Sequence, residues 1–227
     1  MQADQASGLR GKYLRRVAQV VSLFAVQPTL AARLARAIQA RGPRLLLIDT
    51  TGRHALASKT QSIFGWEQQV ARQRILPVSV DGIDWFQAPG AQAGDAALAQ
   101  ANPDYDYVLF DADSVPPGTL ALDLHTAQTL LVEMIAAPEA LCNAYALIKT
   151  LHANPLHVRV ILCGEASVCE RVISATQHFL QARPAWLGTA CIEGDAHLAA
   201  LAARISAAEI TTSQFYNNTG GEFAQHG

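Results

Sequence analysis

Runs of apolar residues alternate with amphipathic segments along most of the chain. "RLLLID" (44–49) and "YDYVLFD" (105–111) are nearly continuous apolar runs, which indicates strands buried on both faces of a sheet. Segment 28–42 is a predicted helix, because Pro28 suits its first turn and Gly42 suits its C-terminal cap. We predict further strands at 18–25, 75–80, 129–137, 158–164 and 185–193, and further helices at 138–151, 166–183 and 194–206.

This alternation of strands and helices predicts an α/β fold. We expect one doubly wound domain with a mostly parallel sheet and helices on both faces. Ligands of such sheets bind beyond the carboxyl ends of the strands. Residues 24–29, 49–54, 111–118 and 136–139 follow predicted strands, so we expect them to share one rim of the sheet.

Composition is that of a globular protein. We expect the α/β domain at 17–208, an exposed arm at 1–16 before it and a polar, flexible tail at 209–227 after it. Of the 227 residues, 50% are apolar and 16% are charged, and the net charge of −2 gives no electrostatic reason to expect nucleic acid as a partner.

The four cysteines have no CxxC spacing, and the N-terminal residues contain no apolar core of a signal peptide. We therefore expect a cytoplasmic protein with reduced cysteines that act as small hydrophobic residues.

Several segments occur in the order found in one known family. They are residues 40–50, 105–112, 138–151 and 175–201, preceded by "DQASGLR" at 4–10. The segments 40–50, 105–112 and 138–151 resemble the MinD/ParA family of deviant P-loop ATPases, the last of them especially its FlhG/FleN flagellar-number branch. Residues 175–201 resemble the FlhG stretch in which a helix leads to an "LG-x-I-x-x-D" strand and loop, and "DQASGLR" resembles the "DQA-x-x-LR" arm that opens FlhG proteins. The resemblance runs from about residue 4 to residue 208 and implies a P-loop NTPase-like fold.

The resemblance also indicates where a nucleotide would bind. The family's loop between first strand and helix is of the type K-G-G-x-G-K-T; its backbone N–H groups surround phosphate, a lysine neutralises charge and the threonine holds Mg²⁺. The corresponding residues here, "AVQPT" (25–29), include no lysine and no glycine. Pro28 even lacks an N–H, and Thr29 alone stands where a metal ligand is expected.

Other parts of the expected site are altered as well. Asp49 corresponds to the first carboxylate of the family's D-x-D pair, but Thr51 replaces the second, while Asp111 remains in the Walker B strand. Each charge-assisted hydrogen bond that is lost with the family's loop and its lysine would contribute about 1.5–3 kcal/mol to phosphate binding. We therefore predict a pseudo-ATPase with no catalytic residues, no metal site and no cofactor. Its vestigial nucleotide site comprises Gln27, Pro28, Thr29, Asp49 and Asp111.

The arm is the retained functional feature. In FlhG proteins this arm engages the signal-recognition-type GTPase FlhF, so the resemblance implies an FlhF-like partner and a role in flagellar number or placement, with recruitment to the flagellated cell pole. The alternative is an ordinary disordered start. The sequence leaves the oligomeric state open. The expected partner-binding residues are Asp4, Gln5, Ala6, Leu9, Arg10 and Tyr13.

The sequence leaves two enzymatic alternatives open. A weak ATPase would use Thr29, Asp49 and Asp111, with ATP and Mg²⁺ as its ligands. A Mg²⁺-dependent phosphotransfer or glycosyl-transfer enzyme would use Asp111 and Asp113, since two carboxylates at this spacing can hold a divalent cation. A purely structural role is also open, in which strand-end carboxylates such as Asp49 cap the N–H groups that follow.

The last predicted helix raises the question of membrane binding. Residues 197–205 have apolar positions at helical spacing, and the family carries an amphipathic membrane helix at its C-terminus. Here Arg204 is the single basic residue of that stretch. We therefore expect a helix that packs on the core, and no strong membrane binding.

Overall fold

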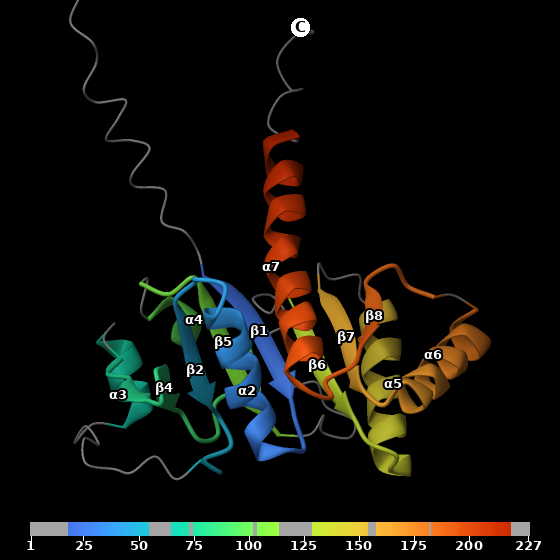
Figure 1. Ribbon diagram of the computed structural model, residues 1–227, viewed down its shortest axis with the longest axis horizontal. Helices are drawn as coiled ribbons and strands as arrows, with labels where there is room; N and C mark the ends of the chain where they lie inside the picture. Colours follow the sequence, from blue (N-terminus) through green and yellow to red (C-terminus); the bar gives the residue numbers. More distant parts are fainter. Residues whose placement is uncertain are drawn as a thin grey trace, which may run out of the picture.

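The chain folds around one mixed sheet with helices on both faces (Figure 1). The computed structural model describes residues 18–54, 65–72, 75–101, 104–113, 129–153, 158–181 and 183–218, with side chains up to residue 207. The strands are β1 (Gln19–Phe24), β2 (Leu45–Asp49), β3 (Val78–Val80), β4 (Ile83–Gln87), β5 (Tyr107–Ala112), β6 (Thr129–Met134), β7 (Arg159–Gly164) and β8 (Leu187–Ala190). The helices are α2 (Pro28–Gln39), α3 (Trp66–Ala71), α4 (Ala96–Gln100), α5 (Pro138–Ala153), α6 (Ala166–Leu180) and α7 (Asp195–Asn218).

The sheet has eight strands in the order β3-β4-β2-β5-β1-β6-β7-β8. All neighbouring pairs are parallel except β3 and β4, as predicted for a mostly parallel sheet. The chain leaves β1 toward β2 on one side, whereas β6, β7 and β8 continue the sheet on the other side of β1. The direction of winding therefore changes between β1 and β6, which is where sheets of this type bind ligands.

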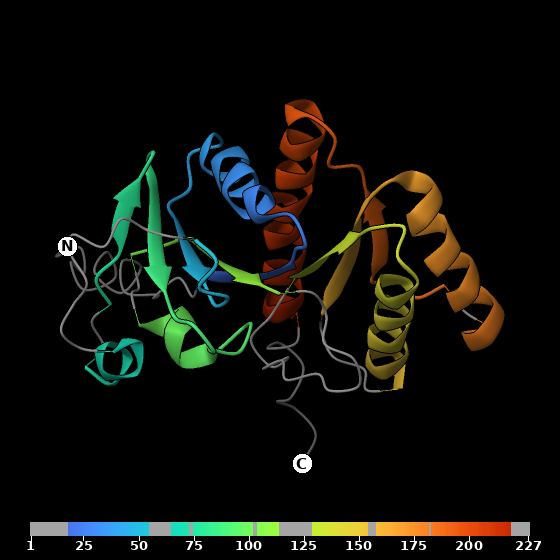
Figure 2. The ribbon, with the colours of Figure 1, turned by 90° about the horizontal axis from the view of Figure 1, so that it is seen from below.

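Side chains of the central strands alternate between two hydrophobic layers. On β5, Val108 and Phe110 pack in the layer of α4, α5 and α6, whereas Tyr107 and Leu109 pack in the layer of α2 and α7. Figure 2 shows α2 and α7 on one face of the sheet and α4 and α5 on the other. Burial of both faces explains why these strands appear in the sequence as continuous apolar runs.

One edge of the sheet differs from the prediction. The strand expected at 75–80 is shorter, and it pairs antiparallel with β4, which we did not predict. Asp81 and Gly82 form the turn between them, with φ angles of 51° and 77°. Positive φ at both central residues is what a type I′ hairpin turn requires, and Asp-Gly is a preferred pair for it.

Helix α7 is longer than predicted. We expected a helix at 194–206 followed by a polar tail from residue 209, but α7 continues to Asn218, so residues 209–218 are helical. Leu198, Leu201 and Ile205 are buried in the same layer as α2, which agrees with the prediction of a core-packing helix. Within the part of the chain that the structure describes, no helix is long and apolar enough to cross a membrane.

The cysteines allow a simple check of the core. All four are free; Cys163 and Cys169 are buried and Cys142 is exposed. Burial raises the pKa of Cys169 to about 11 and raises that of Cys163 further, so both remain thiols near neutral pH. We expect N-ethylmaleimide to modify Cys142 in the native protein within minutes and to leave Cys163 and Cys169 unmodified until denaturant is added.

Peptide mass spectrometry before and after unfolding measures this difference. Equal labelling of Cys142 and Cys163 in the native protein would contradict the packing of β7 described above.

Candidate functional site

The carboxyl ends of three central strands bring the predicted rim together. Asp49 at the end of β2 lies opposite Asp111 of β5, and β5 also pairs with β1, so that Leu23 lies opposite Asp111. The loop from β1 to α2 begins two residues later, at Ala25. One edge of the sheet therefore holds segments 24–29 and 49–54 and the start of 111–118, as the sequence predicted. The described residues do not include 114–118. They also do not include the arm with its predicted partner-binding residues Asp4, Gln5, Ala6, Leu9, Arg10 and Tyr13.

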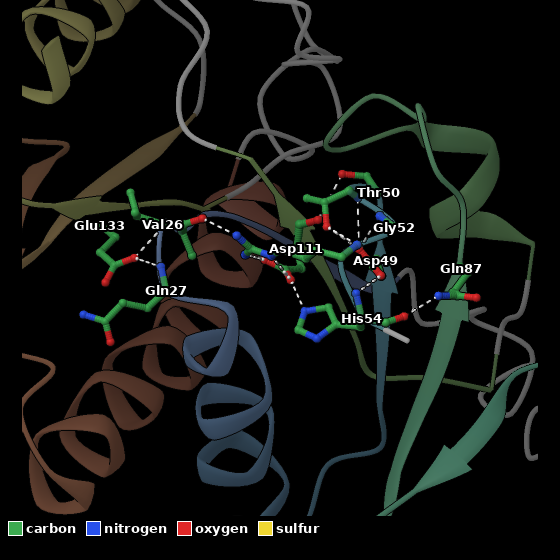
Figure 3. Close-up of polar contacts among 12 residues, drawn as sticks. Val26, Gln27, Asp49, Thr50, Gly52, His54, Gln87, Asp111 and Glu133 are labelled. Carbon is green, nitrogen blue, oxygen red and sulfur yellow. Dashed lines mark hydrogen bonds and ion pairs between the residues drawn. The ribbon is translucent and has the colours of Figure 1, made fainter. Parts of the chain in front are cut away.

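Asp49 organises the loop that follows β2 (Figure 3). Its Oδ1 accepts hydrogen bonds from the Thr51 N–H (3.0 Å), the Thr51 hydroxyl (2.7 Å) and the Gly52 N–H (2.9 Å), and its Oδ2 accepts from the His54 N–H (3.2 Å). Gly52 has a φ of 69°, which glycine adopts without strain. The Gln87 side chain donates to the His54 carbonyl (2.6 Å) and fixes the far end of the loop. Asp49 thus makes the capping contacts of a strand-end carboxylate.

The same loop directs two side chains onto Asp111. Arg53 Nη2 lies 2.6 Å from Asp111 Oδ1, and Arg53 Nη1 donates to the Ala25 carbonyl at 2.8 Å. His54 Nε2 lies 2.7 Å from Asp111 Oδ2, and the His54 ring packs on Trp85 at a centroid distance of 4.8 Å. Burial raises the pKa of the fully buried Asp111 carboxyl, and Arg53 and His54 oppose that rise. Asp111 is therefore paired within the chain.

The loop between β1 and α2 is also filled from inside the chain. Glu133 Oε2 accepts hydrogen bonds from the Val26 N–H at 2.6 Å and from the Gln27 N–H at 2.8 Å (Figure 3). Glu133 belongs to β6, the strand on the far side of the point where the winding changes. Glu133 is 4% exposed, so its carboxylate is buried against the Val26 and Gln27 N–H groups of this loop. In phosphate-binding loops such donors face the phosphate.

The remaining predicted site residues lie at the surface. Gln27, Pro28 and Thr29 are exposed at the start of α2, with Gln27 as its N-cap and Pro28 at its first position. Asp113 is exposed, whereas Asp111 is fully buried. The two carboxylates of the D-x-D alternative therefore differ in environment, and the carboxylate that faces Asp111 across the sheet is Asp49.

Three residues at this edge have the donor atoms of a metal site. Ligand atoms of Asp49, His54 and Asp111 all lie within 4.8 Å of one another. Carboxylate oxygens with one imidazole suit several divalent cations. However, Asp49 already accepts four hydrogen bonds, and the Arg53 guanidinium forms an ion pair with the Asp111 carboxylate. In this arrangement the cluster is an internal ion pair with a supporting hydrogen-bond network, and a cation at Asp111 would have to displace Arg53.

Sequence reasoning missed three residues of the site: Arg53, His54 and Glu133. A signal existed for Glu133, because a charged residue inside an otherwise apolar strand needs a partner when it is buried. Arg53 and His54 lie within the predicted rim segment 49–54, but their partner is 57 or 58 residues away in the chain. The sequence pattern placed the two aspartates correctly at one edge and did not identify what neutralises Asp111.

Solved structures of similar fold include plasmid partition and cell division proteins. A plasmid partition protein from Borrelia burgdorferi superposes with a TM-score of 0.54 at 14% identity, covering 86% of this chain and 99% of that chain. A putative plasmid partition protein from Borrelia burgdorferi B31, bound to AMPPNP, gives a TM-score of 0.50 at 15% identity, covering 80% and 90%. The MinD cell division protein of Aquifex aeolicus gives 0.49 at 18% identity, covering 73% and 79%.

No family model and no curated protein matches the sequence. The similarity to the solved structures therefore concerns the fold. The eight-stranded, mostly parallel sheet with helices on both faces matches the MinD/ParA P-loop NTPase-like α/β fold, so the predicted fold class is confirmed.

Proposed function

We propose that this protein is an FlhG/FleN-like regulator of flagellar number or placement that acts as a pseudo-ATPase. One observation carries the pseudo-ATPase part of the proposal: the Glu133 carboxylate accepts the hydrogen bonds of the Val26 and Gln27 N–H groups, in the loop where a P-loop ATPase holds phosphate. A nucleotide phosphate at this loop would meet a buried negative charge in place of free donors. Catalysis of phosphoryl transfer depends mainly on positioning and electrostatic stabilisation, and this loop supplies neither.

The Walker B position supports the same proposal. Asp111 is held by Arg53 and His54, so a Mg²⁺ ion would compete with a guanidinium at 2.6 Å. Arg53 also bonds the Ala25 carbonyl and so joins Asp111 to the β1–α2 loop. The donors and acceptors that would contact nucleotide and metal are thus engaged with one another.

The regulatory part of the proposal rests on the arm. Its "DQASGLR" resembles the FlhG arm, and we infer that residues 4–14 bind an FlhF-like GTPase, ordering on contact. The protein would then be cytoplasmic and would reach the flagellated pole through that partner. The direct test is the rate of GTP hydrolysis by the purified flagellar GTPase with and without this protein. An unchanged rate at saturating concentration would contradict the proposed partnership.

Titration calorimetry tests the pseudo-ATPase part. Because Glu133 fills the loop and no lysine is available there, we expect no measurable heat of binding for ATP or ADP with Mg²⁺. A MinD/ParA-type ATPase with an intact K-G-G-x-G-K-T loop serves as positive control. A dissociation constant below about 100 μM, or roughly −5.5 kcal/mol of binding, would sink this proposal.

A weak metal-dependent ATPase is the second candidate, since the Asp49, His54 and Asp111 ligand atoms lie within 4.8 Å of one another. This candidate requires Arg53 to move away from Asp111 when the cation binds. Phosphate release from ATP in the presence of Mg²⁺ or Mn²⁺, lost in the Asp111→Asn variant, would favour it over the pseudo-ATPase.

A further inference from the structure

Two arginines lie together at the edge of the sheet where the parallel strands begin. Arg159 is the first residue of β7, and Arg204 belongs to α7. Arg159 Nη1 donates a hydrogen bond to the Arg204 carbonyl at 3.2 Å, and Arg204 Nη1 donates one to the Thr189 carbonyl of β8 at 2.6 Å. Asp49 and Asp111 lie at the opposite edge, where the strands end. The arginine pair is therefore separate from the candidate functional site.

The two guanidinium groups are held by neutral acceptors. Among the residues whose side chains the structure describes, neither Arg159 nor Arg204 belongs to an ion pair. Burial lowers the pKa of Arg159, and the positive charge of Arg204 lowers it further. A carbonyl oxygen carries only a partial negative charge, so an anion beside this pair would stabilise both cations.

The free nitrogens of Arg159 have the arrangement that a carboxylate requires. Nε and Nη2 are buried and have no hydrogen-bond partner within the described part of the chain. These two nitrogens share one edge of the planar guanidinium, so their N–H groups point in parallel, whereas Nη1 bonds the Arg204 carbonyl. Two parallel donors match the two oxygens of a carboxylate. Buried donors without an acceptor are costly, so this edge of Arg159 favours such a ligand.

Arg204 provides the side chain that can move. It is exposed, whereas Arg159 is half-buried beneath α7. Its guanidinium lies against the β8 strand at Gly188, where a Cβ atom would come within 3.1 Å of Arg204 Nη2. Strand β8 is the last strand of the sheet, and the hydrogen bond from Arg204 to the Thr189 carbonyl can be exchanged for one to an incoming anion.

We propose that Arg159 and Arg204 form a binding site for a small carboxylate anion. The Nε and Nη2 groups of Arg159 hold the two carboxylate oxygens, and Arg204 supplies the second positive charge. Binding is noncovalent and requires no change of protonation at neutral pH. The site does not depend on the proposed function, because it uses other residues at the opposite edge of the sheet.

Nuclear magnetic resonance of the full chain provides the test, with acetate as the probe. The Arg159 Nε–H resonance is followed while sodium acetate replaces sodium chloride at constant ionic strength and pH 7. We expect a saturable shift with a dissociation constant on the order of 1 mM. A shift that does not saturate, or no shift at all, would overturn the proposal. A saturable shift with phosphate and none with acetate would overturn the assignment of a carboxylate.

Variants identify the residues that bind, with the amide resonance of Val160 as the common signal. Arg159→Lys keeps the charge and removes the parallel donors, so it should weaken acetate binding at least about tenfold. Arg171→Lys, an exposed change on α6, is the matched control and should bind as the wild type does. Arg204→Ala should weaken binding about threefold, and it provides the test if Arg159→Lys does not fold.

Two outcomes of the variant series contradict the site. Equal acetate binding by the wild type, Arg159→Lys and Arg204→Ala would show that acetate binds elsewhere. Glu209 is the acidic residue that follows Arg204 on α7. If Glu209→Gln shifts the Arg159 Nε–H resonance and acetate does not, the acceptor is a carboxylate of the chain itself, and the site for a small anion is overturned.

Discussion

Deletion of residues 1–14 is expected to abolish stimulation of the FlhF-like GTPase and to leave the melting temperature of the α/β domain nearly unchanged. The β1 strand pairs with β5 from Gln19 onward, and the two hydrophobic layers comprise residues from Ala18 onward in the described part of the chain. The deletion ends before these residues. The loss of activity and the integrity of the fold can therefore be measured separately, by GTP hydrolysis and by thermal melting.

Point substitutions in the arm refine this prediction. Leu9→Ala should weaken binding to the GTPase, because an apolar anchor supplies most of the affinity of a short peptide. Gln5→Ala should lower the stimulated rate more than the affinity, because we propose Gln5 for a polar contact near the nucleotide. Ser7→Ala, at a variable position of "DQA-x-x-LR", is the matched control and should leave both unchanged. If the truncated protein stimulates as well as the full chain does, the arm is not the functional element.

Replacement of Arg53 by alanine should lower the free energy of unfolding by about 3 kcal/mol. Removing one partner of a buried ion pair typically costs about 3–5 kcal/mol, and the lower end applies because 20% of the Arg53 side chain is exposed. Asp111 has no exposed surface and would keep His54 as its remaining partner at this edge. Arg53→Lys should recover only part of the loss, since lysine cannot reach Asp111 and the Ala25 carbonyl with the same planar geometry.

Urea unfolding measures the effect, with Arg36→Ala as control. Arg36 pairs with Asp81 at 3.3 Å, but both side chains are more than half exposed, so its loss should change stability by less than about 0.5 kcal/mol. Substituting Asp111→Asn together with Arg53→Ala should cost less than the single change, because no buried charge is left alone. Equal destabilisation by Arg36→Ala and Arg53→Ala would show that the Asp111 pair is not an important part of the core.

The cost of Arg53→Ala should also depend on pH. Burial raises the pKa of Asp111, so the ionised carboxyl disfavours the folded state above that raised pKa. As pH falls through the raised value toward the ordinary carboxyl range, the folded state takes up the proton first, and the cost of the buried charge is relieved. The difference in stability between wild type and Arg53→Ala is therefore expected to shrink in acid.

Much of the fold could be predicted because its strands are buried on both faces. The apolar runs at 44–49 and 105–111 correspond to β2 and β5, and their final aspartates lie opposite each other in the sheet. The hairpin of β3 and β4 was missed although Asp81-Gly82 signals such a turn, because the flanking strands are short and lie at the edge.

The chemistry of the site was less accessible to sequence reasoning. The apolar pattern predicts where a strand runs and which of its residues are buried. The partner of a buried charge depends instead on the register between strands that are far apart in the chain. Val132 lies opposite Phe24, so Glu133 comes next to the β1–α2 loop. Arg53 and His54 reach Asp111 through a loop shaped by Asp49 and Gly52. A charge inside an apolar strand signals that Glu133 needs a partner, but the identity of each partner follows from three-dimensional geometry.

The Glu133 contact has a consequence for any attempt to engineer an ATPase from this chain. A K-G-G-x-G-K-T loop transplanted between β1 and α2 would lie next to the Glu133 carboxylate, which accepts hydrogen bonds from the backbone of this loop. The new lysine would then pair with Glu133 as readily as with a phosphate. Removing Glu133 alone would leave a cradle without its lysine. Nucleotide binding would thus require at least two changes together, a lysine-containing loop and the removal of Glu133. A screen of single substitutions should therefore not recover nucleotide binding.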